Sequence, residues 1–158
     1  MRTPGSLVTF LLRVTLGWLM FYAGITKLVD PTWSAKGYLM SAKTFPDFYQ
    51  WLATPGMLPL TDFVNEWGLT LLGVSLILGI AVRLSGTLGA LLMILYYFPV
   101  LTFPYIGEHS YLVDEHIVYA AALLVLASMR AGRAWGLEEW CAGLPLCRKF
   151  PGYRSMIG

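Results

Sequence analysis

Three adjacent ionisable residues, Asp114, Glu115 and His116, precede an uncharged apolar run that ends at Met129. From Ile117 to Met129 the run holds 13 residues, about 20 Å of helix, whereas the hydrocarbon core of a bilayer is roughly 30 Å thick. A helix that begins at residue 111 reaches about 28 Å. The sequence therefore predicts a membrane span that contains the trio, and ionisable residues at such depth mark candidate functional sites.

The chemistry that the trio offers is proton transfer. An imidazole titrates near neutral pH and its pKa responds to nearby carboxylates, so His116 is the candidate proton acceptor, with Asp114 and Glu115 beside it. The alternative is helix capping, because the helix macrodipole stabilises carboxylates at a helix N-terminus. Since three adjacent ionisable groups exceed what a cap needs, we favour a catalytic role for the trio.

A metal site at the same place is the less favoured alternative. Glu108 and His109 precede the trio, and imidazole and carboxylate ligands together suit Zn, Fe or Mn. Such a site needs an early start of the helix, which Pro104 and Gly107 oppose. We therefore predict no metal, and whether Glu108, His109 and His116 bind one is left open.

The elements that position these residues are membrane helices. Of the 158 residues, 57% are hydrophobic and only 13% are charged, unlike an average soluble domain. Residues 84–107 carry no charge, which meets the length criterion for a spanning helix. Four spans are predicted, over about 6–28, 63–82, 84–106 and 111–129. The short link at 83–86 implies antiparallel neighbours, so the expected fold is all-α: an integral membrane four-helix bundle, up-down-up-down.

The remaining segments complete a single expected domain over 1–158. Residues 29–61 are rich in proline and aromatic residues, and within them 33–42 and 46–52 have the pattern of short interfacial helices. We expect an aromatic cap over the outer mouth of the bundle, with a simple anchoring belt as the alternative. Residues 130–158 are expected to form a cytoplasmic amphipathic tail.

The distribution of positive charge predicts the orientation. With the N-terminus in the cytoplasm, seven Lys and Arg residues fall on the cytoplasmic side, and three, Lys27, Lys36 and Lys43, fall outside. This bias favours a multi-pass protein of the cell (inner) membrane with both termini cytoplasmic. The expected surroundings are the lipid bilayer, and the sequence has no nucleic-acid motif.

Helical periodicity places more polar residues near the trio. Arg13, Gly24 and Lys27 share one face of the first span, and the inward face of the second carries Asp62, Asn65 and Glu66. We expect an outer cluster in which the trio is joined by Lys27, Asp62, Asn65 and Glu66, although a purely structural role is the stronger alternative for Lys27 and Glu66. For Arg13, extension of its side chain to the cytoplasmic surface is favoured over a pocket shared with Arg83.

The same positions carry a family resemblance. The pattern Leu12-Arg13-x3-Gly17-x3-Phe21-x2-Gly24-x2-Lys27-Leu28, then Glu66-x-Gly68-x4-Gly73-x5-Gly79-x3-Arg83, resembles the DoxX/DoxD membrane proteins. The likeness extends from about Leu7 to Met129, although the acidic trio is less typical of the family. It implies a four-helix membrane protein tied to electron transfer: DoxD-like members are subunits of thiosulfate:quinone oxidoreductase, and DoxX-like members join membrane oxidoreductase assemblies.

The favoured function is a membrane subunit of a quinone-linked oxidoreductase, in the narrowest version of the thiosulfate:quinone type. A quinone site needs an apolar, aromatic slot with proton-donating groups near an interface. The residues expected to bind the quinone are Trp67, Tyr96, Tyr97, Arg13 and Arg83. Those expected to exchange protons are His116, Glu115, Asp114 and Glu66, and Lys27 is expected to hold a substrate anion or a quinone oxygen.

Two functions from other classes stay open. One is a non-catalytic scaffold subunit of a larger respiratory or electron-transfer complex, which fits a small chain without a cofactor motif. The other is a small ion or proton transporter that uses the polar cluster as a relay. Whether the chain is an enzyme, which partner subunits it has, and whether it forms a homo-oligomer are likewise left open.

Overall fold

The computed structural model describes residues 4–106 and 110–138, and within these ranges the chain is helical, as predicted. Isolated bridges, between Thr102 and Tyr105 and between Tyr105 and Tyr111, are the only β-pairing in these ranges. The elements, in chain order, are α1 (Pro4–Leu28), α2 (Lys36–Met40), α3 (Pro46–Leu52), α4 (Leu58–Phe63), the π-helical turn η1 (Val64–Gly68), α5 (Leu69–Leu78), α6 (Val82–Val100), α7 (Glu115–Ser128) and the 3-10 turn η2 (Ala131–Arg133).

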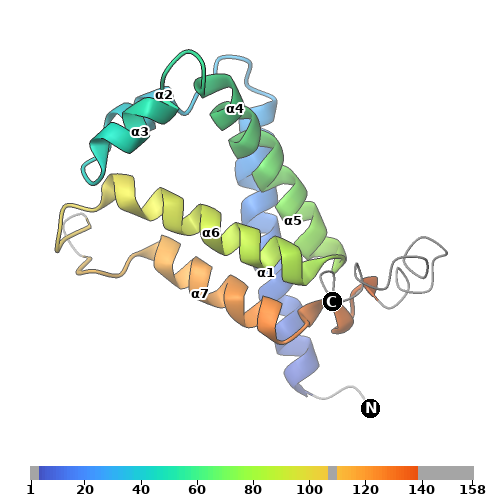
Figure 1. The fold of residues 1–158 in the computed structure, drawn as a ribbon. Coiled ribbons are helices and arrows are strands. Elements are labelled where there is room, and N and C mark those ends of the chain that lie inside the picture. The colour runs from blue at the N-terminus through green and yellow to red at the C-terminus, as the bar shows by residue number, and fades with distance from the viewer. Residues whose placement is uncertain (1–3, 107–109, 139–158) are drawn as a thin grey trace.

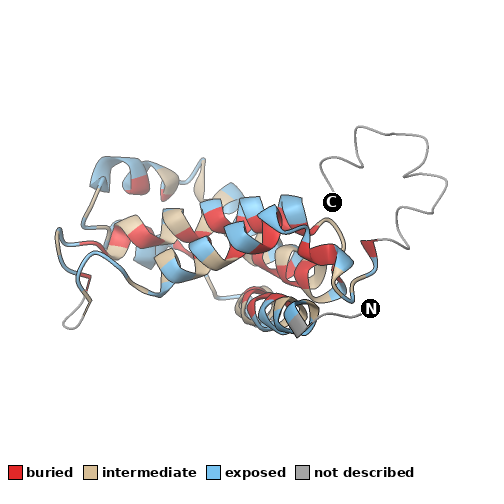
Figure 2. Cartoon of the chain, turned by 90° about the horizontal axis from the view of Figure 1, so that it is seen from below, coloured by how far each residue is buried: buried red, intermediate tan, exposed pale blue. Residues whose placement is uncertain are grey.

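The long helices form two pairs, α1 with α5 and α6 with α7. Figure 1 shows α6 and α7 leading away from α1 and α5 at a wide angle, and in Figure 2 the first helix is seen nearly end-on while the α6–α7 pair extends across the view. The two pairs therefore cross. The predicted bundle of four helices side by side, up-down-up-down, is not confirmed.

Two helices in the described ranges are long and apolar enough to cross a membrane: Gly5–Leu28 of α1, and α6, Val82–Val100. The predicted second span corresponds to α4, η1 and α5, helices of 6, 5 and 10 residues that follow one another without a break. Large apolar side chains are exposed along these helices, for example Trp18, Leu71 and Leu91. Such apolar surface is typical of contact with lipid.

The predicted span over 111–129 begins too early. Helix α7 has 14 residues and begins at Glu115, while Asp114 is its N-cap in an extended conformation. The Asp114 carboxylate accepts hydrogen bonds from the backbone N–H groups of His116 and Ile117, at 3.0 and 3.3 Å. A capped start cannot continue backward, and Leu112 has a positive φ of 59°. The trio therefore marks the start of α7, with Asp114 as its N-cap and Glu115 and His116 as its first residues, and does not lie in the middle of a helix.

The predicted link at 83–86 lies inside α6, and the turn comes earlier. Gly79 ends α5 with a φ of 69°, the left-handed conformation that glycine adopts at low cost. Ala81 also has a positive φ, 54°, directly before Val82. At its other end α6 stops at Val100, short of the predicted 106. Reciprocal backbone hydrogen bonds of 2.8 Å between Thr102 and Tyr105 close a tight turn there.

Helices α2 and α3 form within the two stretches expected to be helical, and they lie across the open end between α4 and α6 (Figure 1). Side chains of this segment bind backbone carbonyls of α6. The Tyr38 hydroxyl donates to the Tyr96 carbonyl at 2.5 Å, and the Tyr49 hydroxyl donates to the Leu95 carbonyl at 2.9 Å. These bonds attach the aromatic segment to α6.

Candidate functional site

A cavity of about 310 Å³ lies where α1, η1, α6, α7 and the segment before α3 approach one another. We call it the polar chamber. Its lining residues are Lys27, Trp33, Ala35, Tyr38, Asn65, Tyr96, Val100 and His116. The fold thus brings Lys27 from α1 and His116 from α7 to one chamber, as expected for the outer cluster.

The imidazole in this chamber is oriented by a carboxylate. Nδ1 of His116 lies 2.6 Å from Oδ2 of Asp114, and the side chains are 21% and 10% exposed. Because a carboxylate can only accept, Nδ1 carries the hydrogen of this bond. Nε2 is then the ring nitrogen that remains free to exchange a proton. The Tyr96 ring meets the imidazole edge-on, with ring centroids 6.1 Å apart.

The cation of the chamber is held by aromatic faces. Nζ of Lys27 lies 4.8 Å from the ring centroid of Trp33 and 5.6 Å from that of Tyr96, within the range of cation–π attraction. The expected ion pair with Glu66 does not form: no carboxylate of the described ranges lies within 4.0 Å of Nζ, and Glu66 acts on it only at longer range. The ammonium therefore retains donors for an incoming acceptor.

The π-helical turn supplies a residue that the sequence places in the outer cluster but to which it assigns no part in binding or proton exchange. Asn65, 8% exposed, donates from Nδ2 to the Thr61 carbonyl at 2.8 Å and accepts a hydrogen bond from the Tyr96 hydroxyl. Turns of this kind recur at functional sites. The sequence signal for Asn65 is its amide side chain in an otherwise apolar helix. On the facing segment, burial raises the pKa of Tyr38 to about 12, so its hydroxyl remains a donor.

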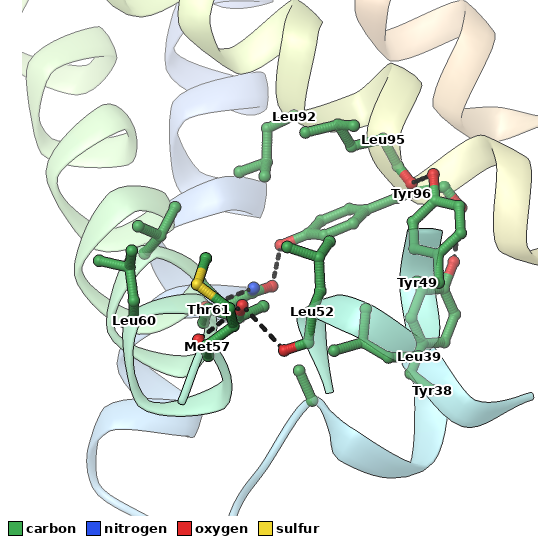
Figure 3. A pocket seen from close by; sticks show the side chains of 13 residues that line it. Tyr38, Leu39, Tyr49, Leu52, Met57, Leu60, Thr61, Leu92, Leu95 and Tyr96 are labelled. Atoms are coloured by element: carbon green, nitrogen blue, oxygen red, sulfur yellow. Dashed lines mark hydrogen bonds between the residues drawn. The ribbon is translucent and has the colours of Figure 1, made fainter. Parts of the chain in front are cut away.

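A second, apolar cavity of about 220 Å³ adjoins the polar chamber (Figure 3). It shares Ala35, Tyr38, Asn65 and Tyr96 with the chamber, so the two cavities adjoin at these residues. The rest of its lining comes from α2, α3, α4, η1, α6 and the adjoining turn: Leu39, Tyr49, Leu52, Met57, Leu60, Thr61, Val64, Leu92 and Leu95.

Other predicted site residues lie away from the chamber. Tyr97 is buried in a separate cluster with Leu101 and Ile106, where its hydroxyl donates to the Leu112 carbonyl at 2.6 Å. Trp67 is exposed and packs against Phe63.

The charged residues predicted for the site are also spread out. Glu115 is exposed on the first turn of α7, and Arg83 is exposed on the first turn of α6. Glu66 is half-buried in η1 and does not line either cavity. Glu108 and His109 lie outside the described residues, as does the expected tail beyond Glu138. In the described ranges no three His, Cys, Asp or Glu side chains are grouped as metal ligands would be.

Arg13 does not extend to the surface as expected. Its side chain is fully buried, and it donates to the carbonyls of Ala131 and Trp135 at 3.3 and 3.5 Å. The reason is that the chain after α7 folds back onto α1 and covers the guanidinium. Glu138, 5% exposed, lies at the end of the same segment.

Glu138 gives the stability of this segment a pH dependence. Burial raises the pKa of Glu138, against the opposing effects of a hydrogen bond from Arg133 and the charges of Arg133, Arg130 and Arg13. A raised carboxyl pKa contributes stability below the unfolded pKa, and this contribution is lost as pH rises through the folded pKa. We expect Glu138→Gln to gain melting temperature relative to the wild type as pH rises above about 4, measured by tryptophan fluorescence in detergent.

Asp30 provides the control of opposite sign. Hydrogen bonds from the hydroxyl and backbone N–H of Thr32 lower the pKa of Asp30, which is fully exposed. Its contribution to stability is present above the unfolded pKa and is lost as pH falls. Asp30→Asn should therefore lose melting temperature relative to the wild type as pH rises toward about 4 and keep a constant deficit above that pH, where Glu138→Gln gains. Parallel curves for the two variants would contradict the assignment.

The fold and the chamber define a class: an all-helical protein with long apolar helices around a chamber lined by a lysine, an imidazole and aromatic rings. A model of the DoxX family matches residues 8–102, more than half of the chain. The chain therefore belongs to the DoxX family, and the family together with the apolar helices indicates a membrane protein. No curated protein and no solved structure matches it.

The matched range covers one part of the chamber. Lys27, Asn65 and Tyr96 fall inside it, whereas Asp114 and His116 follow its end at residue 102. The likeness expected as far as Met129 is thus found only through α6.

Proposed function

We propose that the polar chamber binds the head group of a quinone and that the protein is the membrane subunit of a quinone-linked oxidoreductase. The observation that carries the proposal is the convergence of Lys27 and the Asp114-oriented His116 on one aromatic-lined chamber. A quinone ring presents two carbonyl oxygens that accept hydrogen bonds and a flat face that stacks on aromatic rings.

The residues have distinct parts in this chemistry. Reduction of a quinone to a quinol takes up two electrons and two protons. The Lys27 ammonium donates to one carbonyl oxygen and stabilises the negative charge that develops there. Nε2 of His116 exchanges a proton with a quinone oxygen, while Asp114 holds the imidazole in place through the bond to Nδ1.

The electrons come from a donor outside this chain. In the thiosulfate:quinone version, two thiosulfate ions are oxidised to one tetrathionate and release two electrons, with a partner subunit as the site of that oxidation or with direct transfer to the bound quinone. The proposal retains the cell (inner) membrane as location and both termini in the cytoplasm, on the charge bias of the sequence.

The proposal predicts weaker quinone binding for two variants. Lys27→Met and His116→Gln should each raise the dissociation constant of a quinone without a side chain by about tenfold or more, because the first loses a charged donor to a quinone oxygen and the second loses the ring that faces the head group. Quenching of tryptophan fluorescence in the purified, detergent-solubilised protein measures the constant, since Trp33 lines the chamber.

Glu115→Gln and Lys36→Met are the matched controls, because both side chains are exposed neighbours that do not line the chamber. Wild-type affinity in Lys27→Met and His116→Gln together would contradict the proposal. Stoichiometric partner subunits without bound quinone would point to the scaffold role, and ion flux in liposomes without an electron donor would point to transport.

A further inference from the structure

The apolar cavity beside the chamber offers no free polar group to a ligand. Tyr49 and Thr61 direct their hydroxyls to backbone carbonyls, and the Asn65 side chain bonds Thr61 and Tyr96. No charged side chain lines it. Figure 3 shows leucine side chains and the tyrosine rings surrounding the space. A hydrocarbon group fits such a lining, whereas a polar group would lose its hydrogen bonds to water there.

The mouth of this cavity lies between two helical arms. Leu60 and Val64 on the α4–η1 arm and Leu95 on α6 line the cavity and are exposed. The arms spread apart from the turn at 79–81, with α2 and α3 across their open end (Figure 1). In a membrane protein, exposed leucine and valine side chains of this kind contact the acyl chains of lipid. The cavity therefore opens sideways toward the bilayer.

Size supports a single ligand that extends through both spaces. The apolar cavity, about 220 Å³, is below the roughly 300–1,000 Å³ of ordinary ligand sites. The chamber of about 310 Å³ is at the lower limit. The two cavities share Tyr38, Asn65 and Tyr96 in their linings and therefore adjoin, so one amphipathic molecule that passes these side chains can place its polar end in the chamber and its apolar end in the cavity.

We propose that the apolar cavity is the subsite for the isoprenoid chain of a quinone whose head group occupies the polar chamber, and that the chain enters from the bilayer between Val64 and Leu95. The inference rests on the proposed function and deepens it: the substrate class is a lipid-soluble, chain-bearing quinone. The position of the cavity directly beside the chamber, with four lining residues in common, is the reason for assigning this occupant.

The test asks how quinone affinity depends on the length of the isoprenoid chain. It compares variants at positions that line the apolar cavity with a variant at a position that does not. Dissociation constants are measured for quinones with one head group and no, one or two isoprenoid units, with the full-length protein in nanodiscs. Leu95→Trp fills the mouth, and Leu91→Trp places the same ring on an exposed position of α6 that lines neither cavity. Leu60→Trp repeats the test from the opposite arm.

The expected result is at least a tenfold loss of affinity for the chain-bearing quinones in Leu95→Trp and Leu60→Trp, with unchanged binding of the chainless quinone. Leu91→Trp should match the wild type throughout. Retained binding of the chainless quinone shows that each variant is folded. An equal chain-length dependence in Leu95→Trp and Leu91→Trp would overturn the inference.

Two further outcomes separate the inference from the proposed function. If the wild type binds the chainless quinone and its affinity does not increase with an isoprenoid chain, the subsite is refuted and the head-group site stands. If it binds no quinone at all, the proposed function fails. Native mass spectrometry that finds a phospholipid released by Leu95→Trp, and no quinone, would assign the cavity to a lipid chain instead.

Discussion

Gly73→Ala is expected to lower the melting temperature by about 10 °C, because it forces α1 and α5 apart. A Cβ at Gly73 would lie 2.3 Å from the backbone nitrogen of Phe21 and 2.5 Å from its Cα. Backbone atoms inside a helix cannot step aside, so the whole helix pair has to shift. Overpacking typically costs about 1–3 kcal/mol, and at this chain length about 3 kcal/mol corresponds to roughly 10 °C.

The matched control is Gly68→Ala in the same helical run, where the nearest atom to an added Cβ is Cγ1 of Val64 at 3.8 Å. It should keep the wild-type melting temperature, since alanine is the better helix former and nothing obstructs it. Size-exclusion chromatography after heating in mild detergent measures both variants. A similar loss in Gly68→Ala would show that helix propensity, and not the α1–α5 contact, explains the effect.

A second glycine tests the same interface from the other helix. A Cβ at Gly24 would lie 2.4 Å from the backbone nitrogen of Thr70. Because Gly24→Ala and Gly73→Ala both separate α1 from α5, the double variant should lose less than the sum of the single losses. Additive losses would indicate that the two sites act independently.

These glycines show which part of the fold the sequence predicts well. Small residues at helical spacing indicate close helix packing in membranes, and Gly17, Gly24 and Gly73 do lie where α1 approaches α5. Hydropathy likewise locates the first and third predicted spans as α1 and α6. Both signals depend only on residue type and periodicity, and both are local.

Helix ends and crossings depend on interactions that hydropathy does not register. The prediction of a span over 111–129 rests on a correct count of apolar residues. The Asp114 cap and the positive φ at Leu112, however, fix the start of α7 at Glu115. The crossing of the two helix pairs depends on side-chain contacts between segments far apart in sequence. No periodicity within one helix reports such contacts.

The candidate site is likewise predictable only in part from the sequence. Lys27, Asp114 and His116 are identified because polar side chains in apolar helices turn inward. Tyr96 and Tyr97 are adjacent, and only the rotation of α6 decides that Tyr96 faces the chamber. A face derived from α-helical spacing includes both Asn65 and Glu66, but the π-helical turn changes the helical phase after Val64, and only Asn65 lines the chamber.

Arg13→Met is expected to cause the second large loss of stability, because the Arg13 side chain holds the segment after α7 against α1. The guanidinium binds the carbonyls of Ala131 and Trp135 and occupies the space beside Gly79, where a Cβ would lie 1.7 Å from its Nη1. Without it, two carbonyls lose donors and the buried Glu138 loses a neighbouring positive charge. We expect a loss of about 3 kcal/mol and faster tryptic cleavage after Arg133, both measured on the purified protein.

The double variant Arg13→Met/Glu138→Leu distinguishes two causes of the loss of stability. One is the loss of packing around Arg13, and the other is a buried Glu138 carboxylate without a compensating positive charge. Replacing both buried charged groups by apolar ones removes the uncompensated carboxylate, so the pair should recover part of the melting temperature that Arg13→Met loses. Arg133→Met removes the 3.3 Å contact to Oε1 of Glu138 without touching α1; because it also removes the tryptic site, it is compared by melting temperature, which should stay nearer to the wild type. If Arg13→Met keeps wild-type resistance, the fold-back of the segment 131–138 does not depend on Arg13. If the double variant recovers nothing, the hydrogen bonds to the two carbonyls, rather than the charge of Glu138, account for the loss.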